Sequence, residues 1–195
     1  MLVHLVRHGE VRNPDSLVYG DLPGFGLSED GWAQAQEAAI RLAVFPLTAV
    51  WSSPLQRALQ TAWAIAATHH LPVKVDPDLI EWRLDAWTGI PWSDLADRRP
   101  GELETYLQDP TGLDFAAESL EALAARVAGV IVRVAQDQGG DLAVVAHQDP
   151  LQAARLQLLG QPLGNLHIDK PVHASVITLE PGDPWREVAH WKPPS

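Results

Sequence analysis

The chain has 195 residues, of which 46% are hydrophobic and 20% charged, with a formal net charge of −11 at pH 7. This length and composition are typical of one globular domain, and we predict a single domain over residues 1–195. The negative charge argues against binding to nucleic acid or anionic membranes, and the absence of cysteine excludes disulfides, thiolate nucleophiles and cysteine zinc sites.

The first part of the chain alternates short apolar strands with helices. The predicted elements are a strand at 2–6, a loop at 9–27, a helix after Ser28, a strand at 48–51, a helix through 55–68 and a strand at 73–75. Ser28 is a good N-cap, and its helix places Trp32 and Leu42 on one apolar face. Ser53 as N-cap with Pro54 behind it predicts the start of the next helix.

The remainder continues this alternation. Its predicted elements are two short helical pieces within 92–108, a long helix from near Ser119 to Gly139-Gly140, a strand at 142–146, a helix after an Asp149 N-cap, and strands at 175–179 and 185–189. The last strand is expected at a sheet edge. This order predicts a three-layer α/β/α fold around a mainly parallel central sheet. Ligands of such sheets bind beyond the carboxyl ends of the strands.

Polar residues suited to phosphate chemistry stand at three such strand ends. Arg7 and His8 follow the first strand, Ser52-Ser53 the second, and His147 the strand at 142–146. A histidine is a nucleophile through one ring nitrogen when a hydrogen bond fixes the other. An adjacent arginine can hold a phosphate bidentately. Gly9 is expected to let a backbone amide approach the ligand.

Arg57 adds a second cation to this group. It stands four residues after Ser53, and a helical side chain leans toward the helix N-terminus, whose free amides also bind anions. His147 is expected to be cationic beside a bound phosphate. The two arginines and two histidines predict a phosphoryl-transfer pocket that needs no metal and no other cofactor.

Four blocks, LVRHGE, SSPLQRALQTA, LIEWRLDAWTG and VVAHQDP, resemble in order and spacing the histidine phosphatase superfamily. Within it the chain is similar to the phosphoglycerate-mutase-like branch over nearly its whole length. The resemblance implies that His8 accepts the phosphoryl group. It also implies that Glu81, set among Trp82 and Trp87, protonates the leaving oxygen and later activates water. The side chains it places around the phosphate are Arg7, Asn13, Arg57 and His147.

The chain departs from the family pattern around the second histidine and in the loop after the first. Ala146 replaces a usual Ser or Thr, and Gln148 replaces a usual Gly. Gln148 is expected to crowd the backbone amide beyond His147, and Ala146 lacks the hydroxyl that could add a hydrogen bond. Replacing Ala146 by Ser and Gln148 by Gly together is therefore expected to raise activity on small phosphate esters. Asp85 stands where Gly is usual, and Asn13 comes one residue early.

The other titratable residues are either alternative acids or structural. Glu10, Asp85 and Asp149 compete with Glu81 for the role of acid. The histidines without metal-ligand spacing are taken as structural, namely His4, His167, His173 and His190.

The sequence thus favours a metal-independent phosphomonoesterase that acts on small phosphate esters and resembles α-ribazole phosphatases and broad-specificity phosphatases. A phosphoglycerate mutase remains an alternative, although the segment after Glu81 is short and acidic, with Arg98-Arg99 as its only paired cations. A weakened member that only binds phosphorylated ligands is the other alternative. Met1 leads directly into the first strand, and no apolar run approaches about 20 residues, so we expect a cytoplasmic protein. The sequence carries no signal for an oligomeric state.

Overall fold

The computed structural model describes residues 1–137 and 139–194. The strands are β1 (Val3–Arg7), β2 (Leu47–Ser52), β3 (Val73–Val75), β4 (Asp141–Ala146), β5 (Val176–Glu180) and β6 (Arg186–Trp191). The α-helices are α1 (Glu29–Leu42), α2 (Gln56–Thr68), α3 (Leu95–Arg98), α4 (Glu102–Gln108), α5 (Leu120–Asp137) and α6 (Gln148–Leu158). Short 3-10 helices lie at Pro77–Leu79, Asp85–Trp87, Trp92–Asp94, Pro110–Gly112 and Leu163–Asn165.

The strands form one six-stranded sheet in the order β3-β2-β4-β1-β5-β6. β3, β2, β4 and β1 are parallel to one another, β5 runs antiparallel to β1, and β6 runs antiparallel to β5 at the edge. The mainly parallel sheet and the edge position of the last strand are therefore as predicted. The carboxyl ends of β1 and β4 meet directly, with Arg7 in register with Ala146.

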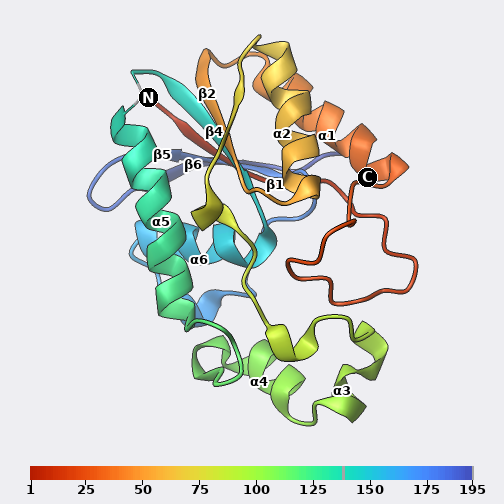
Figure 1. The fold of residues 1–195 in the computed structure, drawn as a ribbon. Helices are drawn as coiled ribbons and strands as arrows, with labels where there is room; N and C mark the ends of the chain where they lie inside the picture. The colour runs from red at the N-terminus through yellow and green to blue at the C-terminus, as the bar shows by residue number, and fades with distance from the viewer. Residues whose placement is uncertain (138, 195) are drawn as a thin grey trace.

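The sheet is covered on both faces (Figure 1). Along β4, Leu142 and Val144 belong to one core cluster, which contains the buried face of α5 and residues of α6. Ala143 and Val145 belong to the other cluster, with α1 and α2. This alternation gives the three layers, because successive side chains of a strand point to opposite faces.

Helix α1 begins as the sequence predicts, but its apolar face differs. The Ser28 hydroxyl accepts the Gly31 N–H at 3.0 Å, as an N-cap does. Trp32 is not part of the buried face, since 39% of it is exposed. The buried face is made of small residues and a leucine: Gly31, Ala35, Ala38, Ala39 and Leu42.

Two predicted helix starts are wrong. Helix α2 begins at Gln56 with Leu55 as its N-cap position, not after Ser53. Helix α6 begins at Gln148 with His147 at the N-cap position, so Asp149 lies inside the first turn and does not cap it. The polar side chains have other partners that are distant in sequence: the Ser53 hydroxyl contacts His147, and the Asp149 carboxylate accepts from Tyr106.

Gly9 serves the packing of α1 against the loop after β1. A Cβ on Gly9 would lie 2.3 Å from the Gly31 carbonyl oxygen, and one on Gly31 would lie 2.0 Å from the Glu10 carbonyl oxygen. The Gly9 amide donates to the Thr61 hydroxyl at 3.1 Å. The expectation that this amide approaches a ligand is therefore wrong, because a side chain of α2 already occupies it.

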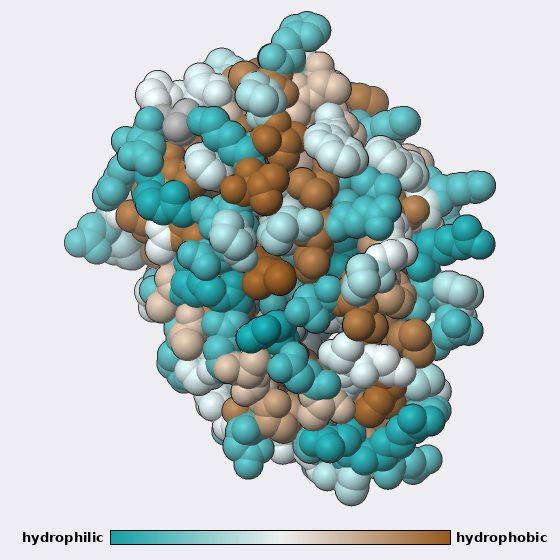
Figure 2. All heavy atoms as spheres, viewed as in Figure 1, coloured by the Kyte–Doolittle hydropathy of each residue, from teal (hydrophilic) through white to brown (hydrophobic). Residues whose placement is uncertain are grey.

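The surface in this view mixes hydrophilic and hydrophobic residues, with apolar ones gathered along its middle (Figure 2). Below them the surface is hollowed, above the part of the molecule that contains α3 and α4 (Figures 1 and 2). None of the described helices combines the length and the apolar character needed to cross a bilayer.

Candidate active site

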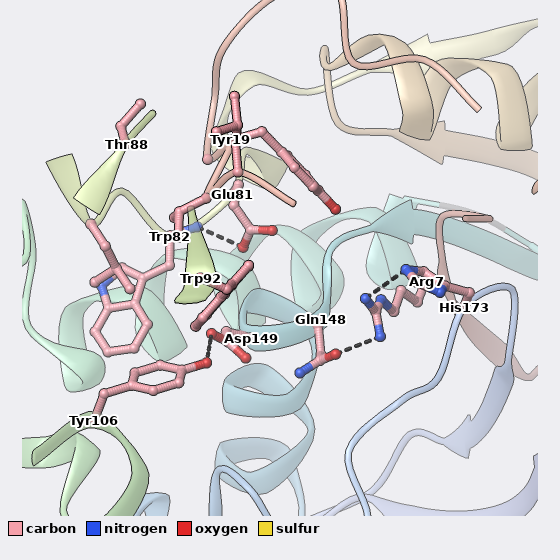
Figure 3. A pocket seen from close by; sticks show the side chains of 14 residues that line it. Arg7, Tyr19, Glu81, Trp82, Thr88, Trp92, Tyr106, Gln148, Asp149 and His173 are labelled. Atoms are coloured by element: carbon pink, nitrogen blue, oxygen red, sulfur yellow. Dashed lines mark hydrogen bonds between the residues drawn. The ribbon is translucent and has the colours of Figure 1, made fainter. Parts of the chain in front are cut away.

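A cavity of about 300 Å³ lies beyond the carboxyl ends of β1 and β4 (Figure 3). Its lining consists of Arg7, Leu17, Val18, Tyr19, Gly20, Glu81, Trp82, Leu84, Thr88, Trp92, Tyr106, Gln148, Asp149 and His173. Three further predicted site residues, His8, Arg57 and His147, are almost fully buried beside it. The ring centroids of the two histidines are 5.3 Å apart. The fold thus brings together groups that are far apart in sequence.

The His8 ring has one fixed nitrogen and one free nitrogen. Nδ1 lies 2.7 Å from the Gly9 carbonyl oxygen, and because a carbonyl only accepts, Nδ1 carries the proton. The lone pair is then on Nε2. Burial, with Arg57 and other positive neighbours, lowers the pKa of His8 well below its usual value. A neutral imidazole with a defined free nitrogen is the form that a nucleophile requires.

Arg7 is held by three partners across the cavity from Glu81 (Figure 3). Nη1 donates to the Gln148 side-chain oxygen and, at 3.1 Å, to the Pro171 carbonyl. Nη2 lies 2.8 Å from Nε2 of His173, which must accept because a guanidinium only donates. Burial lowers the pKa of His173 to about 4, so its ring is neutral and can accept. The buried Nε of Arg7 has no hydrogen-bond partner among the described residues.

The contact between Gln148 and Arg7 suggests a positioning role for Gln148 in place of the crowding expected from the sequence, which stays a prediction. We expect Gln148→Ala to raise KM for p-nitrophenyl phosphate about tenfold with a smaller change in kcat, because one hydrogen bond to a charged group is lost and Arg7 gains freedom. Steady-state kinetics of the variant beside Gln136→Ala, a glutamine of α5 that does not line this cavity, would measure the change. A faster Gln148→Ala enzyme would restore the crowding interpretation.

Arg57, the second residue of α2, is oriented by the loop that the sequence placed at 9–27. Its Nη2 donates to the Gly20 carbonyl at 2.7 Å, and its guanidinium lies 4.7 Å from the ring centroid of Tyr19. Nη2 is also 3.9 Å from Oε2 of Glu81. The cation is thereby fixed beside the candidate acid and does not extend into solvent.

His147 contacts Ser53 through one nitrogen and faces Glu81 through the other. Nε2 lies 2.7 Å from the Ser53 Oγ, which also accepts the Leu55 N–H at 3.3 Å. This arrangement favours donation by the hydroxyl to Nε2, which leaves Nδ1–H directed toward Oε2 of Glu81 at 3.7 Å. Burial, with Arg57 and Arg7, lowers the pKa of His147 well below its usual value. His147 is therefore neutral in this structure, and the cationic form expected from the sequence would require the negative charge of a bound phosphate.

Glu81 has the environment of a proton donor. Oε1 accepts the Trp82 N–H at 2.9 Å, while Oε2 faces Arg57 and His147. Burial and the neighbouring Asp149 raise the pKa of Glu81 to about 7, although Arg57 opposes the shift. Both protonation states are accessible near neutral pH, which suits a group that acts first as an acid and then as a base.

Asn13 is not among the residues that line the cavity. Its Nδ2 donates to the Leu17 carbonyl at 2.9 Å, and its Oδ1 accepts the Leu17 N–H at 3.0 Å. The Asn13 side chain therefore stabilises the turn between residues 13 and 17. One Nδ2 hydrogen is left over, and the phosphate contact expected of Asn13 stays a prediction.

Sequence reasoning missed His173 as part of this site. Its sequence context predicts a structural role, yet it contacts Arg7 and its ring centroid lies 5.7 Å from that of His8. The signal was the position of His173 just before β5, which runs antiparallel to β1. The start of such a strand meets the same sheet edge as the ends of its parallel neighbours, so residues before β5 belong among the candidates.

Comparisons with known proteins give concordant matches over most of the chain. The model of the histidine phosphatase superfamily (branch 1) matches residues 3–192. An uncharacterised protein of Mycobacterium tuberculosis is 40% identical over 163 residues, which are 83% of this chain and 80% of that protein. Phosphoserine phosphatase 1 of Hydrogenobacter thermophilus is 32% identical over 162 residues, 82% and 76% of the two chains. The solved mycobacterial glucosyl-3-phosphoglycerate phosphatase with VO3 has a TM-score of 0.87 at 28% identity, covering 96% of each chain.

Proposed function

Since the chain belongs to branch 1 of the histidine phosphatase superfamily, we propose that it is a phosphomonoesterase that hydrolyses small phosphorylated metabolites through a phosphohistidine on His8. The observation that carries the proposal is the bond from Nδ1 to the Gly9 carbonyl, which leaves Nε2 as the free nitrogen of a neutral ring. Similar proteins named as phosphatases support this reaction class.

The proposed reaction has two steps. In the first, Nε2 of His8 attacks phosphorus, the bond from phosphorus to the leaving oxygen breaks, and Glu81 protonates that oxygen. In the second, ionised Glu81 takes a proton from water, the water oxygen attacks phosphorus, and the P–N bond breaks to release phosphate. Arg7 and Arg57 neutralise the phosphoryl oxygens in both steps.

The charges around the cavity favour hydrolysis over the mutase alternative. A mutase must hold a second anionic group of its substrate while the phosphate is transferred. Arg7 is the only arginine or lysine among the residues that line the cavity in the described part of the chain. The phosphate would engage this cation and Arg57, so neither is left for a second anion.

We expect the purified protein to hydrolyse p-nitrophenyl phosphate at the same rate with and without EDTA. Across residues 1–137 and 139–194, no group of three or more His, Cys, Asp or Glu side chains is arranged to hold a metal ion, and the arginines can supply the charge. The measurement is release of p-nitrophenolate after dialysis against EDTA. Loss of turnover that a divalent cation restores would refute metal independence. Binding of phosphate without turnover would instead identify the weakened member that the sequence left open.

A further inference from the structure

Asp149 is a cavity residue that the proposed reaction does not use. It is the second residue of α6, and Figure 3 shows it beside Tyr106, across the cavity from Arg7. Its Oδ2 accepts the Tyr106 hydroxyl at 2.8 Å. Its Oδ1 is buried and has no hydrogen-bond partner among the described residues. A buried carboxylate oxygen without a partner is costly unless a ligand satisfies it.

The Tyr106 hydroxyl fixes the direction of this carboxylate. Burial raises the pKa of Tyr106 well above its usual value, so the phenol keeps its proton and remains a donor. The Tyr106 ring is itself held, because its centroid lies 5.4 Å from that of Trp87 and 4.6 Å from that of His167. The Asp149 carboxylate, which lines the cavity, is therefore a pre-oriented acceptor, the kind of group that selects a ligand by its hydrogen-bond donors.

The charges near Asp149 determine which leaving groups fit. None of the ion pairs between described residues includes Asp149. A carboxylate on the leaving group would meet the negative charge of Asp149, while the proposed phosphate site uses Arg7 and Arg57. A hydroxyl or ammonium group would instead donate to the Asp149 carboxylate. Trp82, which lines the same cavity, offers an apolar wall for the carbon skeleton.

We infer that Asp149, positioned by Tyr106, selects phosphate esters whose leaving group carries a hydroxyl or ammonium donor and rejects those that carry a carboxylate. This inference rests on the proposed phosphatase function and concerns the leaving-group end of the same cavity.

Two matched pairs of esters test the selection. sn-Glycerol 3-phosphate and 3-phosphoglycerate differ by a hydroxymethyl group against a carboxylate, and phosphoethanolamine and phosphoserine differ only by the carboxylate. We expect the protein to prefer the first ester of each pair by about ten- to hundredfold in kcat/KM, as for a hydrogen bond to a charged group. Asp149→Asn should reduce both ratios about tenfold or more, and Tyr106→Phe should reduce them partly. Asp97→Asn, an exposed aspartate of α3, is the matched control.

The ratio of kcat/KM for two esters is measured on one enzyme preparation. It therefore does not depend on the amount of folded enzyme, and a change in the acidity of Glu81 affects both esters alike. Unchanged ratios in Asp149→Asn, or a native protein that prefers the carboxylate esters, would overturn the inference. If the protein still hydrolyses p-nitrophenyl phosphate, the proposed function would stand in either case. Failure to hydrolyse any ester, p-nitrophenyl phosphate included, would refute both.

Discussion

Replacing His8 by alanine should abolish hydrolysis of every phosphate ester, with a fall in kcat of about 10⁴-fold or more. The reason is that the Nδ1 bond to Gly9 leaves the lone pair on Nε2 of His8, in a neutral ring beside Arg7 and Arg57. The other imidazole of the pair, His147, is bonded through Nε2 to Ser53 and cannot replace it without moving.

The measurement pairs turnover with chemical trapping. The native protein, quenched with denaturant during turnover of a radiolabelled ester, should carry an acid-labile and base-stable phosphoryl group that maps to His8. His8→Ala should carry none, whereas His190→Ala, on the edge strand β6, should behave as the native protein. Because His8 is buried, His8→Asn and a thermal unfolding curve of each variant separate lost chemistry from lost folding. Label on another residue, or turnover by a folded His8 variant, would reject the assignment.

The sequence predicts that these site residues lie close together, because their proximity depends only on the topology of the sheet. An apolar run ending in Arg7-His8 and another ending before His147 both read as buried parallel strands, and parallel neighbours end at one sheet edge. Arg57 follows from the same rule, since its helix starts where β2 ends. Predicting that these residues come together required no knowledge of side-chain packing.

What the sequence could not predict depends on partners that are distant along the chain. Local capping rules assigned Ser53 and Asp149 to helix starts, but His147 and Tyr106 compete for their oxygens. The role of Gly9 depends on Gly31, whose carbonyl occupies the space of a side chain. No rule of local spacing contains these contacts, because each arises only when two layers of the fold pack.

Replacing Glu81 by glutamine should slow hydrolysis of alkyl phosphates by about 10²–10⁴-fold, the usual contribution of a general acid. An alkoxide leaves poorly without a proton, and Glu81 is the carboxyl that faces both Arg57 and His147. p-Nitrophenolate leaves readily without protonation. The burst that reports phosphoenzyme formation from p-nitrophenyl phosphate should therefore lose much less rate than the burst from an alkyl ester.

The pH dependence gives the same test a second readout. Burial and Asp149 raise the pKa of Glu81 to about 7, so the protonated acid is present below that pH and is lost as the pH rises through it. The burst rate with an alkyl ester should fall about tenfold per pH unit above this value. Glu81→Gln should show no such fall, because its amide does not titrate there.

Glu121→Gln, an exposed glutamate of α5, is the matched control and should reproduce both the rates and the pH profile of the native protein. Glutamine keeps the size of the side chain and an oxygen to accept the Trp82 N–H, so the variant tests the proton and not the packing. Equal loss of burst rate with both esters would show that Glu81 does not protonate the leaving group. Asp149 would then be the next carboxylate to test, because it lines the same cavity and Asp85 does not.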